Sequence, residues 1–370
     1  MPTEPISPDW TSLVQSIQDG EAVLVLGPDA IPYYHGETVS SFSALTREAI
    51  MQEVGKEILH FYERDNLFQF RDSRSKRKAR KCIREVARTP EWQPDDELLR
   101  QIVSIPFPVV LNLNPDRRVF DAFVKYWRAP QFDYFTTKDK PELFSVEYPT
   151  GQKPLLYNLA GSVEDKMDST VLDYNDLFDL LKNLLSDHGV PENLTNKLKE
   201  ADHFVLLGVE LERWYLQLFL HYINQLDSPF DNYNHNYPIF CRISEDSRQF
   251  IIKQFNITHH SLSREDFGRI YESCAAKRGL LRKLRDPLSP QAEKIRGMVI
   301  AGQLDQAFSE LTTLLDEDAN LIELPLLQAR YHNYLENQRA GIMAEADLKL
   351  EINQIRYALL SFAAQIAANG

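Results

Sequence analysis

Residues 22–31 read AVLVLGPDAI, an apolar run that stops at Gly27. Such a run is typical of a strand that is buried on both faces of a parallel sheet. A glycine directly after the strand is typical of loops whose backbone N–H groups approach a phosphate. Pro28 and Asp29 depart from that pattern, because proline lacks an N–H and aspartate repels an anion. The stretch predicts a buried first strand and leaves open whether its loop still binds a nucleotide.

Similar apolar runs recur along the chain and alternate with amphipathic helical patterns. This alternation predicts an α/β fold, a Rossmann-like parallel sheet with helices on both faces. Ligands of such sheets bind beyond the carboxyl ends of the strands, so the residues after each strand form the candidate site. The expected strands are residues 22–26, 108–113, 154–157, 170–172, 203–207 and 238–243. The clearest helical patterns cover residues 42–54, 118–127, 175–185, 212–226 and 247–255.

Strand patterns stop near RGLLRKLRDPLSPQ, residues 278–291, where prolines break any helix. We therefore place a Rossmann-like domain at residues 1–280, a linker at 281–290 and a small all-α domain at 291–370. The last helix carries apolar residues in alternating steps of four and three, which is typical of a bundle seam or a coiled coil. These residues are Leu348, Ile352, Ile355, Leu359, Phe362 and Ile366. We expect a contact module that supports a homo-oligomer; the alternative is a helical cap on the main domain.

The composition excludes several classes of protein. The net charge is −13, so binding to nucleic acid or to an anionic membrane would have to be local. No apolar stretch reaches the ~20 residues that a membrane span needs, and the first residues lack the pattern of a signal peptide. The three cysteines form no CxxC pair, which argues against a zinc site and against a disulfide framework. We expect a cytoplasmic protein that binds no metal.

One strongly basic segment stands out from this acidic chain. Nine Lys and Arg residues fall between Arg71 and Arg88. Most runs of this kind are solvated helix faces; the alternative is an anionic partner such as a phosphate-bearing ligand, a nucleic acid or an acidic protein surface. No aromatic residues are interleaved with the charges, which argues against sequence-specific reading of RNA.

The polar residues that could carry chemistry follow the expected strands. In VVLNLNPDRRVF, residues 109–120, the strand is followed by Asn112, Asn114 and Asp116. One interpretation is an Asn-Pro turn in which Asp116 caps the next helix. The other places the two asparagines and the aspartate at the mouth of the sheet, where they could bond a ribose or an amide. Later strands are followed by Gly161 and by Gly208 with Glu212 in an acidic first helical turn, which a helix dipole also favours.

These segments, in this order over residues 10–275, resemble the sirtuin-like NAD-binding domain, closest to the bacterial branch linked to antiphage conflict systems. That branch hydrolyses NAD and lacks a zinc module. The resemblance implies that Asn114 and Asp116 are catalytic and that NAD is bound by the strand-end residues. The implied NAD-binding residues are Gly27, Asp29, Ala30, Asn112, Asn114, Gly161, Gly208 and Glu212. Residues 291–370 resemble helical effector-associated domains, adaptors that pair with matching domains of other defence proteins.

The departures from the family pattern bear on activity. Ala160 occupies the position of the family's catalytic histidine, and alanine cannot transfer a proton. His35, which we expect in the loop after the first strand, is a candidate replacement, although a lone loop histidine is usually just solvated. Three hypotheses follow: an NAD hydrolase switched on through its helical tail, a catalytically degenerate sensor or scaffold, and a purely structural assembly protein. Whether the chain is an enzyme stays open at this point.

Overall fold

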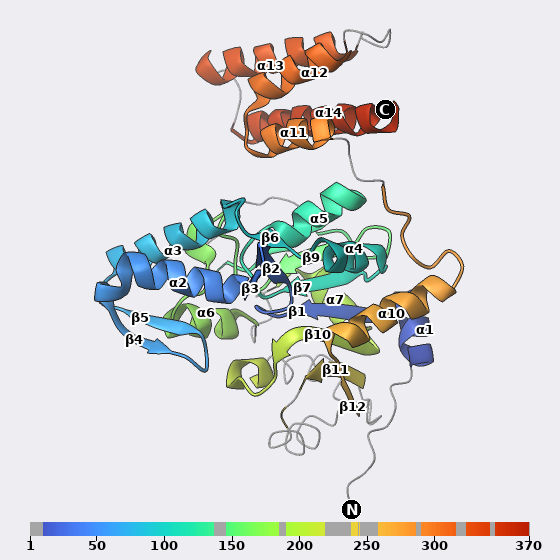
Figure 1. The fold of residues 1–370 in the computed structure, drawn as a ribbon. Coiled ribbons are helices and arrows are strands. Elements are labelled where there is room, and N and C mark those ends of the chain that lie inside the picture. The colour runs from blue at the N-terminus through green and yellow to red at the C-terminus, as the bar shows by residue number, and fades with distance from the viewer. Residues whose placement is uncertain are drawn as a thin grey trace, which may run out of the picture. The chain divides into compact units, whose positions relative to one another are not determined.

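The structure is a computed structural model that describes residues 10–136, 146–184, 190–218, 238–242, 244, 258–285, 290–315, 323–340 and 345–369. Its contacts divide the chain into two compact units, Met1–Leu284 and Arg285–Gly370. The first unit is built on a seven-stranded parallel sheet, and the second is helical (Figure 1). The α/β fold class expected from the sequence is therefore confirmed.

The strands of the large sheet are arranged in the order β12-β11-β10-β1-β7-β9-β8. The chain starts at the centre with β1, builds outward through β7 and β9, and then returns to build the other half from β10. This is the order of a doubly wound sheet with one additional edge strand, β8. The direction switches between β1 and β10, which lie side by side, so their carboxyl ends flank the expected crevice. The strands are β1 (Ala22–Leu26), β7 (Val109–Asn112), β8 (Gln131–Tyr134), β9 (Leu155–Asn158), β10 (His203–Glu210), β11 (Pro238–Arg242) and β12 (Thr258–Ser261).

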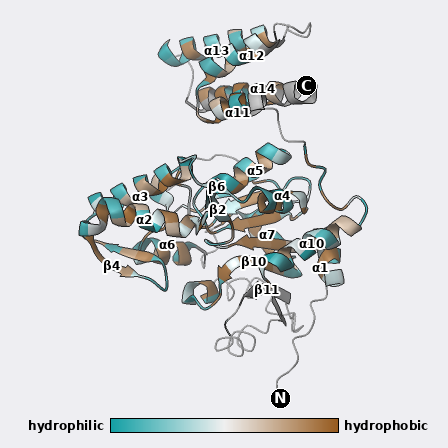
Figure 2. Ribbon diagram, in the orientation of Figure 1, coloured by the Kyte–Doolittle hydropathy of each residue, from teal (hydrophilic) through white to brown (hydrophobic). Residues whose placement is uncertain are grey.

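The strands β1, β7 and β9 are buried on both faces, which explains their unbroken apolar runs. Leu24 and Leu26 contribute to one hydrophobic core, whereas Val23 and Val25 contribute to the other. In Figure 2 the central strands are drawn mostly in the hydrophobic colour and α3 mostly in the hydrophilic one. The first core contains α1 (Trp10–Asp19), α2 (Phe42–Val54), α3 (Ser73–Arg88), α4 (Asp96–Ser104), α5 (Arg118–Tyr126) and α10 (Arg264–Ala276). The second contains α6 (Tyr174–Leu184) and α7 (Glu192–Lys199).

Several elements differ from the sequence-based expectation. Residues 170–172 do not form a strand: Val171 N–H donates to the Ala160 carbonyl in a loop that follows η2 (Met167–Ser169). The Leu172 carbonyl accepts the Phe68 N–H of the neighbouring hairpin, but no strand is assigned to residues 170–172, so the prediction was wrong. His35 lies at the end of a strand rather than in a loop. The unexpected short strands are β2 (Pro32–His35), β3 (Thr38–Ser41), β4 (Ile58–Tyr62), β5 (Leu67–Phe70) and β6 (Gln93–Pro94). The pattern at residues 247–255, and most of that at 212–226, falls outside the described residues.

The described residues of the second unit form four helices around a separate hydrophobic core. Ile355 and Leu359, at the centre of the predicted apolar stripe, are completely buried in that core. The stripe is therefore a seam within the bundle. No helix in the described parts of the chain is long and apolar enough to cross a membrane. The helices are α11 (Pro290–Ile300), α12 (Leu304–Leu315), α13 (Glu323–Ala340) and α14 (Glu345–Asn369).

Candidate functional site

The loop after β1 packs directly against the carboxyl end of β10. Gly27 N–H donates to the Leu207 carbonyl, and a Cβ placed on Gly27 would lie 1.8 Å from the Gly208 carbonyl oxygen. Gly208 has a φ of +65°, and a Cβ placed there would lie 2.4 Å from the Ala30 nitrogen. Only glycine fits at either position, because the two backbones touch. The glycines that a nucleotide loop would use to approach a phosphate are used here to approach each other.

The asparagines at the ends of β7 and β9 form a buried polar network. Asn112 Nδ2 donates to Asn158 Oδ1 at 3.1 Å, and Asn158 Nδ2 donates to the Asp116 carbonyl at 2.8 Å. Asn112 Oδ1 accepts the Asn114 N–H, while Asn114 Nδ2 donates to the Pro28 carbonyl at 3.4 Å. Asn114 thus faces the loop after β1, as the sequence-based interpretation requires, but its amide is engaged with that loop.

Asp116 is buried beneath the same network, with only 2% of its surface exposed. Its carboxylate accepts the backbone N–H of Arg118 and the Tyr33 hydroxyl, at 3.1 and 3.5 Å. The N-cap of α5 is Arg117, which makes no side-chain capping hydrogen bond, so the interpretation of Asp116 as the N-cap was wrong; Asp116 lies one residue earlier and accepts the first helical N–H. Burial raises the pKa of the Asp116 carboxyl, with the nearby Arg118 opposing, and burial also raises the pKa of Tyr33. The Arg118 guanidinium stacks 4.9 Å from the centre of the Tyr33 ring.

Very little space remains in the crevice between the β1 loop and β10. The cavity lined by Pro28, Asp29 and Gly208 holds about 10 Å³. A volume of this size accommodates about one water molecule, whereas cavities for cofactors and other small molecules measure roughly 300–1,000 Å³. A second cavity of about 120 Å³ lies beside it, and Ala160 and Leu113 are among its mostly apolar lining residues. Ala160, which the sequence resemblance aligns with a catalytic histidine, therefore borders an apolar cavity.

Polar groups at the rim of the larger cavity were not anticipated from the sequence. Asp65, in the turn between β4 and β5, accepts the Tyr174 hydroxyl through Oδ2, and its buried Oδ1 has no partner among the described residues. The pKa of Tyr174 is raised to about 12 by burial and by Asp65. Arg213 bonds both Glu210 and the Tyr215 hydroxyl. The hairpin turn that positions Asp65 lies far from any predicted strand end, so strand-end reasoning could not find it.

The remaining predicted residues lie at the edges of this arrangement. Gly161 has a φ of +87° and packs against the backbone of Ser169, and the Glu212 carboxylate accepts the Ser244 N–H. The exposed His35 ring packs edge-on against Trp92 at 5.4 Å. Among the described residues, no three His, Cys, Asp or Glu side chains are grouped as metal ligands. The structure thus brings together Gly27, Ala30, Asn114 and Gly208, with Asp116 buried behind them.

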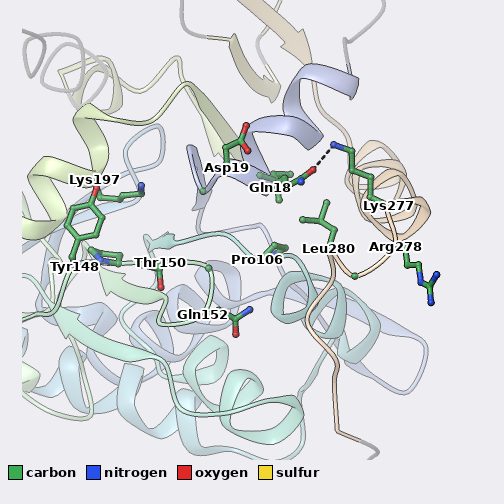
Figure 3. Close-up of a pocket in the computed structure, with 15 residues that line it drawn as sticks. Gln18, Asp19, Pro106, Tyr148, Thr150, Gln152, Lys197, Lys277, Arg278 and Leu280 are labelled. Carbon is green, nitrogen blue, oxygen red and sulfur yellow. Dashed lines mark hydrogen bonds between the residues drawn. The ribbon is translucent and has the colours of Figure 1, made fainter.

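A larger cavity of about 550 Å³ lies at the amino ends of the strands, opposite the candidate site (Figure 3). Its lining includes Gly20 before β1 and Pro106 before β7. Two of its cations already have partners: Lys197 bonds Glu200, and Lys277 donates to Gln15 and Gln18. The lining presents neither a nucleophile beside a base nor a metal-ligand group, so this cavity carries no chemistry that we can assign.

Comparison with known proteins identifies the second unit. The family model of effector-associated domain 11 matches residues 290–367. The chain therefore carries an effector-associated domain at its carboxyl end, a type of domain associated with bacterial conflict systems. A search of curated proteins finds no match to the chain.

Proposed function

We propose that this protein is a catalytically degenerate, sirtuin-like scaffold of a bacterial defence system, which assembles through its effector-associated domain. The observation that carries the proposal is the closed crevice between Gly27 and Gly208, with room for about 10 Å³. A dinucleotide cannot enter unless the β1 loop separates from β10. That separation would break the Gly27–Leu207 hydrogen bond and expose a close-packed backbone contact.

The chemistry of the site supports the same conclusion. Hydrolysis of the nicotinamide bond in the sirtuin-like family uses a histidine, and Ala160 offers no proton acceptor in its place. Loss of a general base alone typically costs a factor of about 100 to 10,000 in rate. Asn114 and Asp116 match the sirtuin-like family. However, Asn114 Nδ2 donates to the Pro28 carbonyl, and the Asp116 carboxylate accepts the Arg118 N–H and the Tyr33 hydroxyl. The alternative function, an NAD hydrolase activated through the tail, rests on the presence of these two residues.

Exposed apolar side chains on the effector-associated domain support assembly. Leu326 on α13 is 64% exposed and Tyr357 on α14 is 71% exposed. An ion pair between Arg330 and Glu351 joins the two helices; Leu326 lies about one helical turn from Arg330, and Tyr357 lies nearly two turns from Glu351. Contiguous exposed apolar patches are typical of contact surfaces, and the proposal takes Leu326 and Tyr357 as parts of one such patch. The proposed partner is the same domain of a second copy, which makes the protein a homo-oligomer.

Incubation of the full chain with NAD tests the catalytic part of the proposal. We expect neither release of nicotinamide from NAD nor heat of binding on calorimetric titration with NAD or ADP-ribose. The Ala160→His variant should also fail to hydrolyse NAD, because the crevice stays closed. Regained hydrolysis in this variant would show that the pocket is otherwise intact. Hydrolysis by the wild type that is lost in the Asn114→Ala variant would favour the NAD hydrolase instead.

Light scattering of the full chain tests the assembly part. We expect an oligomer for the wild type and a lower mass for the Leu326→Glu, Tyr357→Glu double variant. Leu59→Glu is the matched control, since Leu59 is 56% exposed but lies on β4 of the α/β unit. A monomeric wild type, or equal masses for the wild type and the double variant, would contradict this part.

A further inference from the structure

The charge of the chain is unevenly distributed. Residues 71–88 contain nine Lys and Arg against Asp72 and Glu85, a net charge of +7 (9 − 2). Because the whole chain has a net charge of −13, the rest carries −20 (−13 − 7). Most of the basic segment is α3, which lies beside α2 at the periphery of the α/β unit (Figure 1). A local field of the opposite sign to the rest of the protein would attract anions to this helix.

Some of these cations have structural roles. Lys76 binds Asp173 and Asp176, and Arg80, whose side chain is only 9% exposed, binds Asp176 and Asp168. These two side chains attach α3 to the first turn of α6 and to the segment that precedes it. Structural ion pairs therefore account for two of the basic residues and leave the others unexplained.

The exposed Glu85 lies on one face of α3 together with six of the other seven cations, which we call the basic stripe. They follow the helical spacing of three and four residues, and all but the last have no side-chain partner among the described residues. The last, Arg88, lies 4.0 Å from Glu164 at the limit of an ion pair. The members of the basic stripe are Arg74, Arg77, Lys78, Lys81, Arg84 and Arg88. They are exposed or half-buried, and the helix's apolar residues point the other way, into the core.

The composition of the stripe distinguishes between anionic partners. A membrane-binding helix inserts apolar side chains, but Ala79, Cys82 and Ile83 are buried inside the α/β unit. A protein interface needs apolar or aromatic anchors, and the exposed face of α3 offers only charged groups. A phosphodiester backbone needs only a row of cations, and arginine binds phosphate through two parallel hydrogen bonds. The stripe therefore fits the backbone of nucleic acid best.

The length of the stripe is compatible with this partner. From Arg74 to Arg88 the helix rises about 21 Å, at about 1.5 Å per residue. A DNA strand presents a phosphate every ~3.4 Å along the duplex axis, so about six phosphates fall within that length. We infer that the basic stripe of α3 is a sequence-independent binding surface for the sugar-phosphate backbone of nucleic acid. It gives the proposed scaffold a ligand whose binding does not depend on any nucleotide at the strand ends.

Fluorescence anisotropy of the full chain with a labelled 30-base-pair DNA duplex tests this inference, with single-stranded DNA and RNA as parallel arms. We expect binding in the micromolar range or tighter at 50 mM salt. The logarithm of the affinity should fall with the logarithm of salt concentration with a slope of about −5, since each of about six neutralised phosphates contributes about −0.9. The arms decide whether a duplex or a single strand is the preferred source of the phosphates.

Two triple variants locate the binding surface. The Arg77→Gln, Lys78→Gln, Lys81→Gln variant should reduce the slope to about −3, because three phosphate contacts are lost. The control variant Lys153→Gln, Lys199→Gln, Arg269→Gln makes the same change in net charge at exposed sites outside α3, and it should keep the wild-type slope. Unchanged tryptophan fluorescence and helical circular dichroism check that both variants fold.

Several outcomes would overturn the inference. These are the absence of binding in all three nucleic-acid arms at 50 mM salt, an equal loss of affinity in both triple variants, and wild-type affinity in the stripe variant. Binding to vesicles that contain phosphatidylserine, without binding to nucleic acid, would assign the stripe to a membrane surface instead. None of these outcomes depends on whether the proposed scaffold binds NAD.

Discussion

Substitution of Gly208 by alanine tests the backbone contact that closes the crevice. The left-handed conformation of Gly208, with φ +65°, costs an L-residue about 1–2 kcal/mol. In addition, the new Cβ would lie 2.4 Å from the Ala30 nitrogen and 2.5 Å from its Cα, so backbone must move. Forcing extra atoms into packed structure typically costs about 1–3 kcal/mol. We expect the Gly208→Ala variant to lose about 3 kcal/mol of unfolding free energy.

Gly36 offers a matched control for the backbone conformation alone. Its φ is +58°, close to that of Gly208, and an added Cβ would meet no atom within 4 Å. The Gly36→Ala variant should therefore lose only the cost of the left-handed conformation, about 1 kcal/mol. The reduction in the entropy of the unfolded chain is the same in both variants and cancels in the comparison.

Urea denaturation followed by tryptophan fluorescence is the appropriate assay. The four tryptophans are Trp10, Trp92, Trp127 and Trp214, and all lie in the unit Met1–Leu284. Their fluorescence thus reports unfolding of the α/β unit without a contribution from the helical unit. Equal losses in the two alanine variants would refute the reasoning, because the contact between the β1 loop and β10 would then contribute nothing.

Three further variants probe the surroundings of the site. Burial raises the pKa of Asp116 above 3.8, so the folded protein keeps this proton to a higher pH than the unfolded chain does. The unfolding free energy, compared with that of the Asp116→Asn variant, should therefore be greatest below pH 3.8. It should fall as the pH rises through the raised pKa. Unfolding measured from pH 3.5 to 7 checks this, and a constant difference would contradict it. The Arg282 guanidinium donates hydrogen bonds to the carbonyls of Gly151, Val103, Ile105 and Phe107. The Arg282→Met variant leaves these acceptors unpaired, so its unfolding free energy in urea denaturation should be about 4 kcal/mol lower. A loss below about 1 kcal/mol would contradict a stabilising role for these hydrogen bonds. The Ala160→Leu variant fills the adjacent cavity, so its unfolding free energy should be about 1 kcal/mol higher, measured as a higher urea midpoint. A lower midpoint would argue against the cavity.

The long apolar strands of the sheet could be predicted from the sequence because burial on both faces leaves a continuous pattern. The expected strands at residues 22–26 and 203–207 coincide with β1 and with the buried first part of β10. The expected strand at 238–243 covers β11 (Pro238–Arg242). The short strands could not be predicted in this way. Gln131–Tyr134 forms the sheet edge with half-buried, mixed side chains, and β4 has no alternation of buried and exposed residues. Their strand structure depends on pairing partners distant in sequence, which periodicity does not reveal.

The candidate site shows the same limit. The convergence of the strand ends and the inward position of Asn114 followed from the parallel order. The contact between Gly27 and Gly208 did not, because a glycine that admits a phosphate and a glycine that admits a second backbone look alike in sequence. Asp65 was missed for another reason: its hairpin reaches the cavity from an insertion between α2 and α3, and only tertiary packing brings it there.

Calorimetric titration of the full chain with NAD tests the central claim most directly. The claim is that the crevice at the switch point is occupied by the protein's own backbone. We expect no saturable heat with NAD at millimolar concentration, for both the wild type and the Asn114→Ala variant. A stoichiometric binding isotherm for the wild type that disappears in the Asn114→Ala variant would contradict the claim, because it would show that the β1 loop and β10 separate to admit the dinucleotide.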